Sequence, residues 1–265
     1  MKDLIKQYLD DGLSRRRLMS GLGALGLSAA ASKSVAQSLA PVMQAPRGPA
    51  MREMRGTGGA LFVAQLKAAG VEYVFFNPST GDYPIFDALV DEPGIQLIKG
   101  IQEGAVVAMA DGYARASGKT GVAIVANVGL PNAMTQMVNT WKDQVPLLLA
   151  VASVEQDALG RDLQQESDYA EVMTQPITKW YWAAKSTASI PETVRRGMKF
   201  ASTPPGGPVF LALPNNTLRE EATAQIWDQA KFDVPMHIRA DQDEDRKSTR
   251  LNSSHLPTSR MPSSA

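Results

Sequence analysis

Short, continuous apolar runs alternate along the middle of this chain with stretches whose apolar residues recur at helical spacing. The strand-like runs cover residues 71–76, 95–98, 122–126, 146–152, 179–184 and 208–213. Strands that are apolar on both faces are typical of parallel sheets covered by helices on either side. The sequence therefore predicts an α/β fold in three layers, α/β/α, doubly wound around a mainly parallel sheet of about six strands.

The composition excludes several kinds of site. Basic and acidic residues balance at 27 each, so the charge gives no case for nucleic acid as a partner. The chain has no cysteine and only two histidines, His237 and His255, which excludes disulfides and effectively excludes a Cys/His zinc site. We expect no metal site within this chain. Any catalysis must therefore use carboxylates, amides, hydroxyls or a cofactor.

Residues 1–37 resemble a twin-arginine signal, the address that exports folded proteins. Arg15 and Arg16 precede a mildly apolar run at residues 22–31, and residues 34–36 offer a small-residue cleavage site. The apolar run is too short and too rich in glycine and alanine for a stable membrane span. We therefore expect a periplasmic protein. The alternative is a disordered, basic amphipathic leader on a cytoplasmic protein.

Changes in composition set the other boundaries. Residues 38–55 contain three prolines and are predicted to be a linker, followed by one domain over residues 56–218 and the start of an inter-domain linker over 219–245. Residues 246–265 have few large apolar residues and no periodicity, so we expect them to be disordered. They also resemble translated library-adapter sequence, which suggests a truncated protein whose natural sequence continues differently.

Glu103 begins a predicted helix that Gly118 would end as a C-terminal cap. The plain reading of Glu103 is a first-turn acid favoured by the helix dipole. Together with the stretch Met109-Ala-Asp-Gly-Tyr-Ala-Arg115, however, it resembles the pyrimidine-binding domain of thiamine-diphosphate enzymes of the acetolactate synthase and benzoylformate decarboxylase type. The resemblance implies that Glu103 is catalytic. It would hydrogen-bond a ring nitrogen of the cofactor's aminopyrimidine and so promote loss of the thiazolium proton.

Two loops that follow predicted strands also resemble motifs of this family. The loop 77–82, Asn-Pro-Ser-Thr-Gly-Asp, is similar to the family's Asn-Pro-Gly-Ser-Asn-Glu. This implies cofactor contacts for Asn77 and Pro78, and it places Thr80 where benzoylformate decarboxylase uses a Ser to contact substrate. Without the resemblance, the loop would be an ordinary Pro/Gly turn.

The second loop, residues 127–132, is similar to the family's Gly-Pro-Gly-Ala-Thr-Asn turn. The match implies that Gly129 and Asn132 bind the cofactor, although Asn132 could equally be a helix cap. In parallel α/β sheets ligands lie beyond the carboxyl ends of the strands, which is where both loops and Glu103 are expected.

Other positions qualify the resemblance. Val125 stands where benzoylformate decarboxylase carries a His, which argues against a straightforward enzyme of that kind. Gln165 and Glu166 resemble the Phe-Gln-Glu segment at the active-site entrance of acetolactate synthases, so Gln165 is a candidate for the substrate pocket. The other reading of this segment is a solvated polar loop.

The resemblance covers about residues 56–218 and implies part of an acetolactate-synthase-like lyase or carboligase, a transferase or decarboxylase acting on a small 2-oxo acid. In this family Mg²⁺ is held by a Gly-Asp-Gly…Asn motif in a later domain, which is missing here. FAD could bind a middle domain of the full-length protein, which we expect to be a homodimer or tetramer. We expect the fragment alone to be inactive. The alternative is a non-catalytic, doubly wound module that binds a ligand or partner, although no Gly-x-Gly-x-x-Gly or Walker loop supports nucleotide binding.

Overall fold

The computed structural model describes residues 2–9, 14–35, 50–167 and 169–231. The predicted tail at 246–265 lies outside the described residues. So do residues 38–49 of the predicted linker and residues 232–245 of the predicted inter-domain linker.

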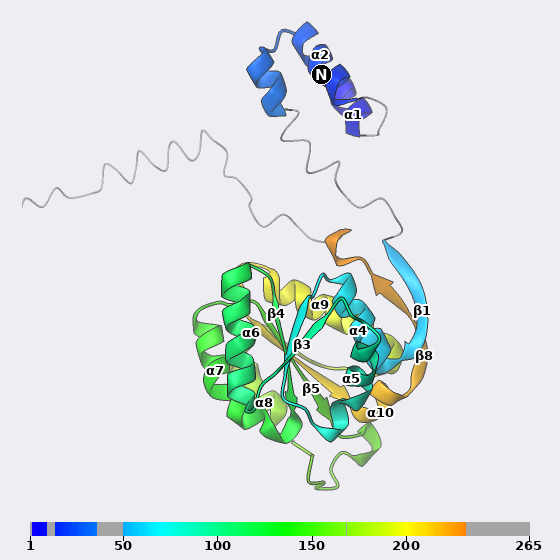
Figure 1. The fold of residues 1–265 in the computed structure, drawn as a ribbon, viewed down its shortest axis with the longest axis vertical. Coiled ribbons are helices and arrows are strands. Elements are labelled where there is room, and N and C mark those ends of the chain that lie inside the picture. The colour runs from blue at the N-terminus through cyan, green and yellow to red at the C-terminus, as the bar shows by residue number, and fades with distance from the viewer. Residues whose placement is uncertain (1, 10–13, 36–49, 168, 232–265) are drawn as a thin grey trace, which may run out of the picture. The chain divides into compact units, whose positions relative to one another are not determined.

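A six-stranded parallel sheet forms the middle of the α/β domain (Figure 1). In spatial order its strands are β3 (Gln96–Lys99), β2 (Tyr73–Phe76), β4 (Gly121–Ala126), β5 (Leu147–Ser153), β7 (Pro208–Pro214) and β6 (Trp180–Ala183). Each strand runs parallel to its neighbours. The three strands β4, β5 and β7 are buried along almost their whole length, as strands covered on both faces must be.

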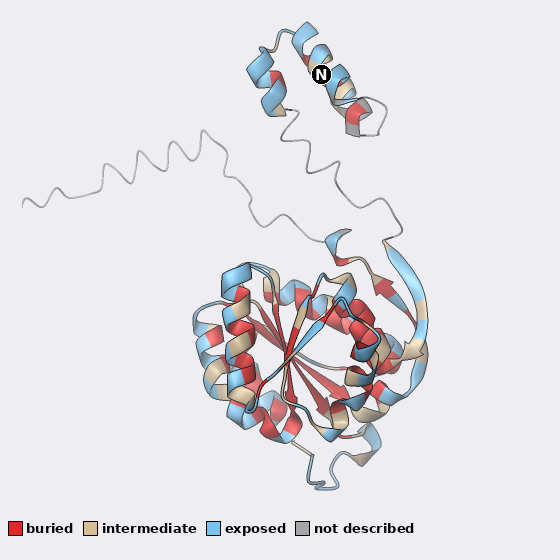
Figure 2. Ribbon diagram, in the orientation of Figure 1, coloured by how far each residue is buried: buried red, intermediate tan, exposed pale blue. Residues whose placement is uncertain are grey.

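Helices cover both faces of this sheet (Figure 2). One face carries α4 (Gly58–Ala68), α5 (Tyr83–Val90) and α9 (Ile190–Ser202), and the other carries α6 (Glu103–Ser117), α7 (Leu130–Lys142) and the short α8 (Ala170–Thr174). Along β4, Val122 and Ile124 belong to the first core, whereas Ala123 and Val125 belong to the second. This alternation follows from the pleat of the strand. The predicted three-layer, doubly wound α/β/α fold is confirmed.

Two strands outside the main sheet change the predicted domain boundaries. β1 (Met51–Thr57) pairs antiparallel with β8 (Glu221–Trp227), which follows the short helix α10 (Asn215–Arg219). Residues of β8 pack against α4, and the side chain of Gln65 exchanges two 2.9 Å hydrogen bonds with the backbone of Trp227. Residues 51–55 therefore belong to the domain and not to the linker predicted over 38–55. Residues 221–227 likewise form a strand where an inter-domain linker was expected, because β8 buries only alternate residues and its apolar signal is weak.

The described part of the N-terminal segment contains helices. α1 (Lys2–Leu9) and α2 (Arg15–Ala24) bury Tyr8, Leu18 and Leu22 in a small apolar cluster. Ser14 caps α2 by accepting a hydrogen bond from the backbone N–H of Arg17 at 3.4 Å. No helix in the described part of the chain combines the length and the apolar character that crossing a membrane requires.

Candidate functional site

Three loops meet at the carboxyl ends of β3, β2 and β4, which are neighbours in the sheet. Asn77, the first residue after β2, lies between the other two. Its side-chain amide donates to the carbonyl of Gly100 after β3 at 3.3 Å, and its backbone N–H donates to Ile124 of β4 at 3.0 Å. The predicted residue Asn77 therefore holds the loop ends together. Pro78 is exposed beside it.

Glu103 is the first residue of α6. The helix begins there because the side chain of Gln102 accepts the N–H of Ala105 at 2.9 Å, and it ends at Gly118, whose φ of 72° suits a glycine cap. This start places the half-buried carboxylate of Glu103 at the edge of the sheet. One of its oxygens, Oε2, accepts a hydrogen bond from the Asn132 amide at 3.1 Å.

The other oxygen, Oε1, lies against Gly129. A Cβ atom at Gly129 would lie 2.1 Å from this oxygen, so the position must be glycine for Glu103 to reach over the start of α7. No described residue donates a hydrogen bond to Oε1. The structure thus brings together three residues predicted from the sequence, Glu103, Gly129 and Asn132, and leaves one carboxylate oxygen available to a ligand.

A second group of predicted residues lies around a cavity of about 220 Å³. Thr80 and Gln165 both line this cavity, together with Ser79, Gly81, Tyr83, Ser153, Asn215 and Arg219. Neither Glu103 nor Asn132 is among its lining residues. The predicted residues therefore form two groups at the same end of the sheet, one around Glu103 and one around this cavity.

Backbone contacts position Gln165. Its carbonyl accepts a hydrogen bond from the side chain of Asn127, the first residue after β4, at 2.8 Å. The next residue, Glu166, accepts the N–H groups of Gly160 and of Leu163, the latter at 3.1 Å. Glu166 thus closes its own loop, while Asn127 ties that loop to the end of β4.

Sequence reasoning missed Asp82, whose side chain is fully buried beneath the loop after β2. Its Oδ2 atom accepts the backbone N–H and the hydroxyl of Ser79, at 3.0 and 2.8 Å. Burial raises the pKa of Asp82 to about 6, although the hydrogen bonds from Ser79 oppose this shift. The Ser-x-x-Asp spacing of residues 79–82 is similar to that of a capping box and could have indicated the interaction.

Asp111, the acid of the motif after Glu103, has a structural role. It is 3% exposed and accepts hydrogen bonds from Arg115 Nε at 2.5 Å and from the Thr140 hydroxyl at 2.7 Å. Hydrogen bonds to Asp111 and Asp143 raise the pKa of Arg115 above its usual value. These contacts join α6 to α7 and so fix Glu103 relative to Gly129.

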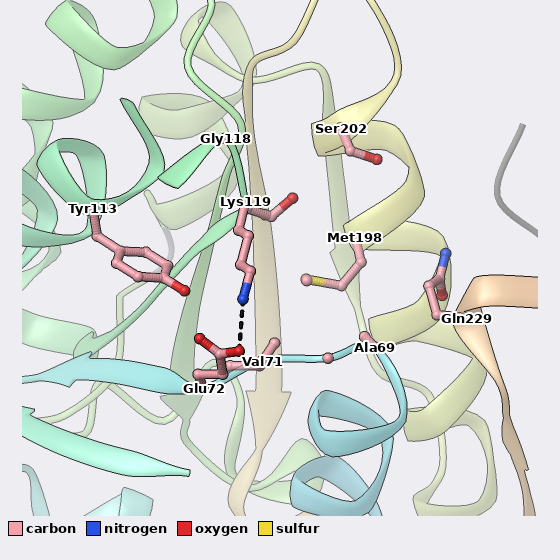
Figure 3. Close-up of a pocket in the computed structure, with 11 residues that line it drawn as sticks. Ala69, Val71, Glu72, Tyr113, Gly118, Lys119, Met198, Ser202 and Gln229 are labelled. Carbon is pink, nitrogen blue, oxygen red and sulfur yellow. Dashed lines mark hydrogen bonds and ion pairs between the residues drawn. The ribbon is translucent and has the colours of Figure 1, made fainter. Parts of the chain in front are cut away.

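A larger cavity, of about 470 Å³, lies at the opposite end of the sheet, where β2 and β4 begin (Figure 3). Lys119 Nζ reaches Glu72 Oε1 at 2.6 Å inside it, and Tyr113 and Met198 also line it. None of the predicted site residues lines this cavity. Because ligands of parallel α/β sheets bind beyond the carboxyl ends of the strands, its size does not make it the candidate site.

The described residues offer a partner for the aminopyrimidine ring of the expected cofactor but no cluster of side chains for its Mg²⁺. The Glu103 carboxylate, with one oxygen available beside a glycine, suits an aminopyrimidine ring that exchanges a proton. By contrast, the described residues contain no group of three or more His, Asp or Glu side chains that could hold a metal ion. The described residues thus provide no side-chain cluster for Mg²⁺.

Comparisons with known proteins agree with the reading of the domain. Residues 56–172 match the family model described as thiamine pyrophosphate enzyme, N-terminal TPP binding domain. The acetolactate synthase large subunit of Lactococcus lactis subsp. lactis is 36% identical over 168 residues, which are 63% of this chain and 29% of that protein. The large subunit of Haemophilus influenzae is 35% identical over 61% of this chain and 28% of its own length. The chain thus spans less than a third of the length of these relatives.

A solved structure shows the same fold. The thiamine diphosphate-dependent 4-hydroxybenzoylformate decarboxylase of Rhodococcus jostii RHA1 superposes with a TM-score of 0.65 over 75% of this chain and 38% of that one. The sequence identity of 24% makes this a likeness of fold alone.

Proposed function

We propose that residues 56–218 are the pyrimidine-binding part of a thiamine-diphosphate site in an acetolactate-synthase-like enzyme that acts on a small 2-oxo acid. The observation that carries the proposal is the arrangement of Glu103 across Gly129, with one oxygen held by Asn132 and the other available. The match to a TPP binding domain and the acetolactate synthase relatives support it. They do not favour the alternative of a non-catalytic binding module.

Each candidate site residue has a role in the proposed reaction. Thiamine diphosphate, when bound, supplies a thiazolium carbon that adds to the carbonyl of a 2-oxo acid. Glu103 would share a proton with the aminopyrimidine ring, while Asn132 orients the carboxylate and Gly129 leaves room for it. Asn77 and Pro78 would line the cofactor side of the loop after β2. Thr80 and Gln165 would contact the 2-oxo acid from the 220 Å³ cavity.

The other parts of the site would come from the complete protein. We propose that further domains hold Mg²⁺ with the diphosphate, that FAD could bind there, and that the enzyme assembles as a homodimer or tetramer. Whether it decarboxylates or ligates its substrate would depend on those domains and on the residues that close the cavity.

The test of the Glu103 assignment is Glu103→Gln in the complete enzyme, with Glu72→Gln at the opposite end of the sheet as the matched control. Glutamine keeps the size of the side chain but cannot accept the proton. Exchange of the thiazolium proton and turnover should therefore fall about 100- to 10,000-fold, with a much smaller change in cofactor affinity.

A structural role for Glu103 has a different signature. The loss of a first-turn charge would lower folding stability by about 0.3–1 kcal/mol and leave proton exchange near normal. Near-normal exchange in the folded Gln variant would remove Glu103 from the catalytic residues.

We also propose that residues 1–37 direct export to the periplasm through a twin-arginine route. The supporting observations are the Arg15-Arg16 pair, the short apolar run and the small-residue site. Replacing both arginines by lysine should keep the protein in the cytoplasm, whereas the conservative control Arg52→Lys in β1 should be exported normally. Cell fractionation measures the result, and unchanged periplasmic delivery of the double variant would contradict the proposal.

A further inference from the structure

We propose that Asp82 is a positioning residue, which holds the turn of residues 79–81 so that Thr80 and the backbone of Gly81 form one wall of the 220 Å³ cavity. The assignment of a 2-oxo acid to that cavity rests on the proposed function, but the positioning role of Asp82 does not.

Asp82 holds the turn from below. Ser79, Thr80, Gly81 and Tyr83 all line the cavity, whereas Asp82 between them is fully buried and does not. One carboxylate oxygen accepts both the N–H and the hydroxyl of Ser79, at 3.0 and 2.8 Å. The Asp82 N–H in turn donates to the carbonyl of Ser79 at 3.3 Å. These bonds connect Ser79 with Asp82 and fix the two residues between them, Thr80 and Gly81.

Asn215, the first residue after β7, holds the turn from the side. With its amide nitrogen facing two carbonyls, it donates to Gly81 at 3.1 Å and to Ser153 at the end of β5 at 3.2 Å. A Cβ atom at Gly81 would lie 2.6 Å from the end of the Asn215 side-chain amide, so glycine allows this close approach. The turn is thus fixed to the ends of two strands of the main sheet.

The turn leaves the Thr80 side chain available to a ligand. Thr80 is exposed, and no described residue forms a hydrogen bond with its hydroxyl, whereas the hydroxyl of Ser79 is used by Asp82. The charged side chain that lines the same cavity, Arg219, is ion-paired with Glu155. A neutral polar wall with a free hydroxyl suits the carbonyl or carboxylate oxygens of a small acid.

Burying the Asp82 carboxyl group lowers stability, and forming a turn does not by itself require a buried acid. Asp82 Oδ1 is buried and forms no side-chain hydrogen bond among the described residues, although the backbone N–H of Ala152 is close enough to the carboxyl group to lower its pKa. A buried polar atom that is so poorly paired lowers stability. Many turns of this kind are made without a buried acid. The charge-assisted bonds to Ser79 are the compensating interaction, because an ionised acceptor makes stronger hydrogen bonds than a neutral one.

The experiment follows the turn by ¹⁵N NMR in the 265-residue chain. Asp82→Ala removes the acceptor, Asp82→Asn removes the titrating group, and Asp87→Asn changes an exposed acid on α5 as the matched control. In the wild type and in the control, the Thr80 and Gly81 amides should have order parameters of about 0.85, as in β2, and these should fall below about 0.6 in Asp82→Ala while β2 is unchanged. A folded Asp82→Ala variant with an ordered turn would overturn the proposal.

A pH titration gives the second readout. The Thr80 amide should titrate with a midpoint near the pKa of Asp82, about 6, in the wild type and in Asp87→Asn. The transition should be absent in Asp82→Asn, and its persistence there would overturn the proposal. If Asp82→Ala does not fold, Ser79→Ala replaces it. Loss of a hydrogen bond that lowers the pKa of Asp82 should move the midpoint upward, and an unchanged midpoint would count against the proposal.

Pyruvate, used as the probe acid, separates this inference from the proposed function. Pyruvate should shift the Thr80 and Gln165 resonances in the wild type. It should bind about 2- to 10-fold more weakly to Asp82→Ala, the effect of one misplaced hydrogen bond. If the turn loosens as expected but pyruvate shifts neither resonance, the positioning role stands and the 2-oxo acid assignment of the cavity falls.

Discussion

At Glu103, two small features of the neighbouring turn decide how the carboxylate lies. Gly129 provides the space, since any side chain there would collide with Oε1, and Asn132 fixes the second oxygen at 3.1 Å. The 15-residue helix α6 contributes only its first turn to the site, and Gln102 fixes where that turn begins. The geometry therefore depends on residues 102–103 and on the turn of residues 129–132, which are separate in the sequence but adjacent at the sheet edge.

Asp82→Asn should remove a pH dependence of folding stability. The pKa of Asp82 is raised in the folded protein from 3.8 to about 6, so its protonated form stabilises the fold below pH 3.8 and this contribution is lost as the pH rises towards 6. A shift of this size corresponds to roughly 3 kcal/mol at most. Urea unfolding at pH 4, 5, 6 and 7 should show the wild type losing stability relative to Asp82→Asn. Parallel profiles for the two proteins would contradict the expected linkage, and Asp87→Asn should follow the wild type.

At the scale of elements, the relative position of α6 and α7 matters most to the Glu103 site. The two helices carry Glu103 and Asn132 on their first turns, and Asp111 links them further along through Thr140. Arg115 continues the link to Asp143 at the end of α7 at 2.7 Å. The motif Met109–Arg115 is interpreted from the sequence as a family signature. Two of its residues, Asp111 and Arg115, also connect α6 to α7.

Thr140→Val tests this link between helices. Valine keeps the shape of threonine but removes the hydroxyl that donates to the buried Asp111 at 2.7 Å, so the unfolding free energy should fall by about 1–3 kcal/mol. The matched control, Asp143→Asn, weakens the half-exposed ion pair with Arg115, which should cost no more than about 1 kcal/mol. Chemical denaturation of both variants measures the difference. Equal losses in the two variants would mean that the buried bond is not what joins the helices.

The sequence was sufficient for the main elements but not for their arrangement. Continuous apolar runs are strong signals, so the strands of the main sheet and the helix after Glu103 could be predicted from residue pattern alone. β1 and β8 could not, because they are half-exposed and paired across more than 160 residues. The 220 Å³ cavity depends on the strand order, which puts the ends of β2, β5 and β7 together, and no local pattern contains that order.

At the scale of the molecule, the described residues contain a carboxylate site and a polar cavity but no cluster of metal-binding side chains. The carboxyl end of one sheet carries the Glu103 carboxylate, which we propose for a pyrimidine ring, and, separately, a small polar cavity. No described cluster of acids and histidines could hold a metal beside them. Under the proposed function, the described residues would hold only the pyrimidine end of the cofactor and would not by themselves position its reactive carbon.

From this incomplete arrangement we predict that the purified chain does not turn over pyruvate when supplied with thiamine diphosphate and Mg²⁺. Positioning of the reacting carbon accounts for a large part of the rate of such reactions, and one-sided binding does not provide it. Pyruvate loss would be followed against a no-protein blank, with Glu103→Gln as the matched control. Consumption that Glu103→Gln abolishes would contradict the prediction, because it would mean that this chain completes the site by itself. Consumption that the variant leaves unchanged would instead come from a source that does not use Glu103.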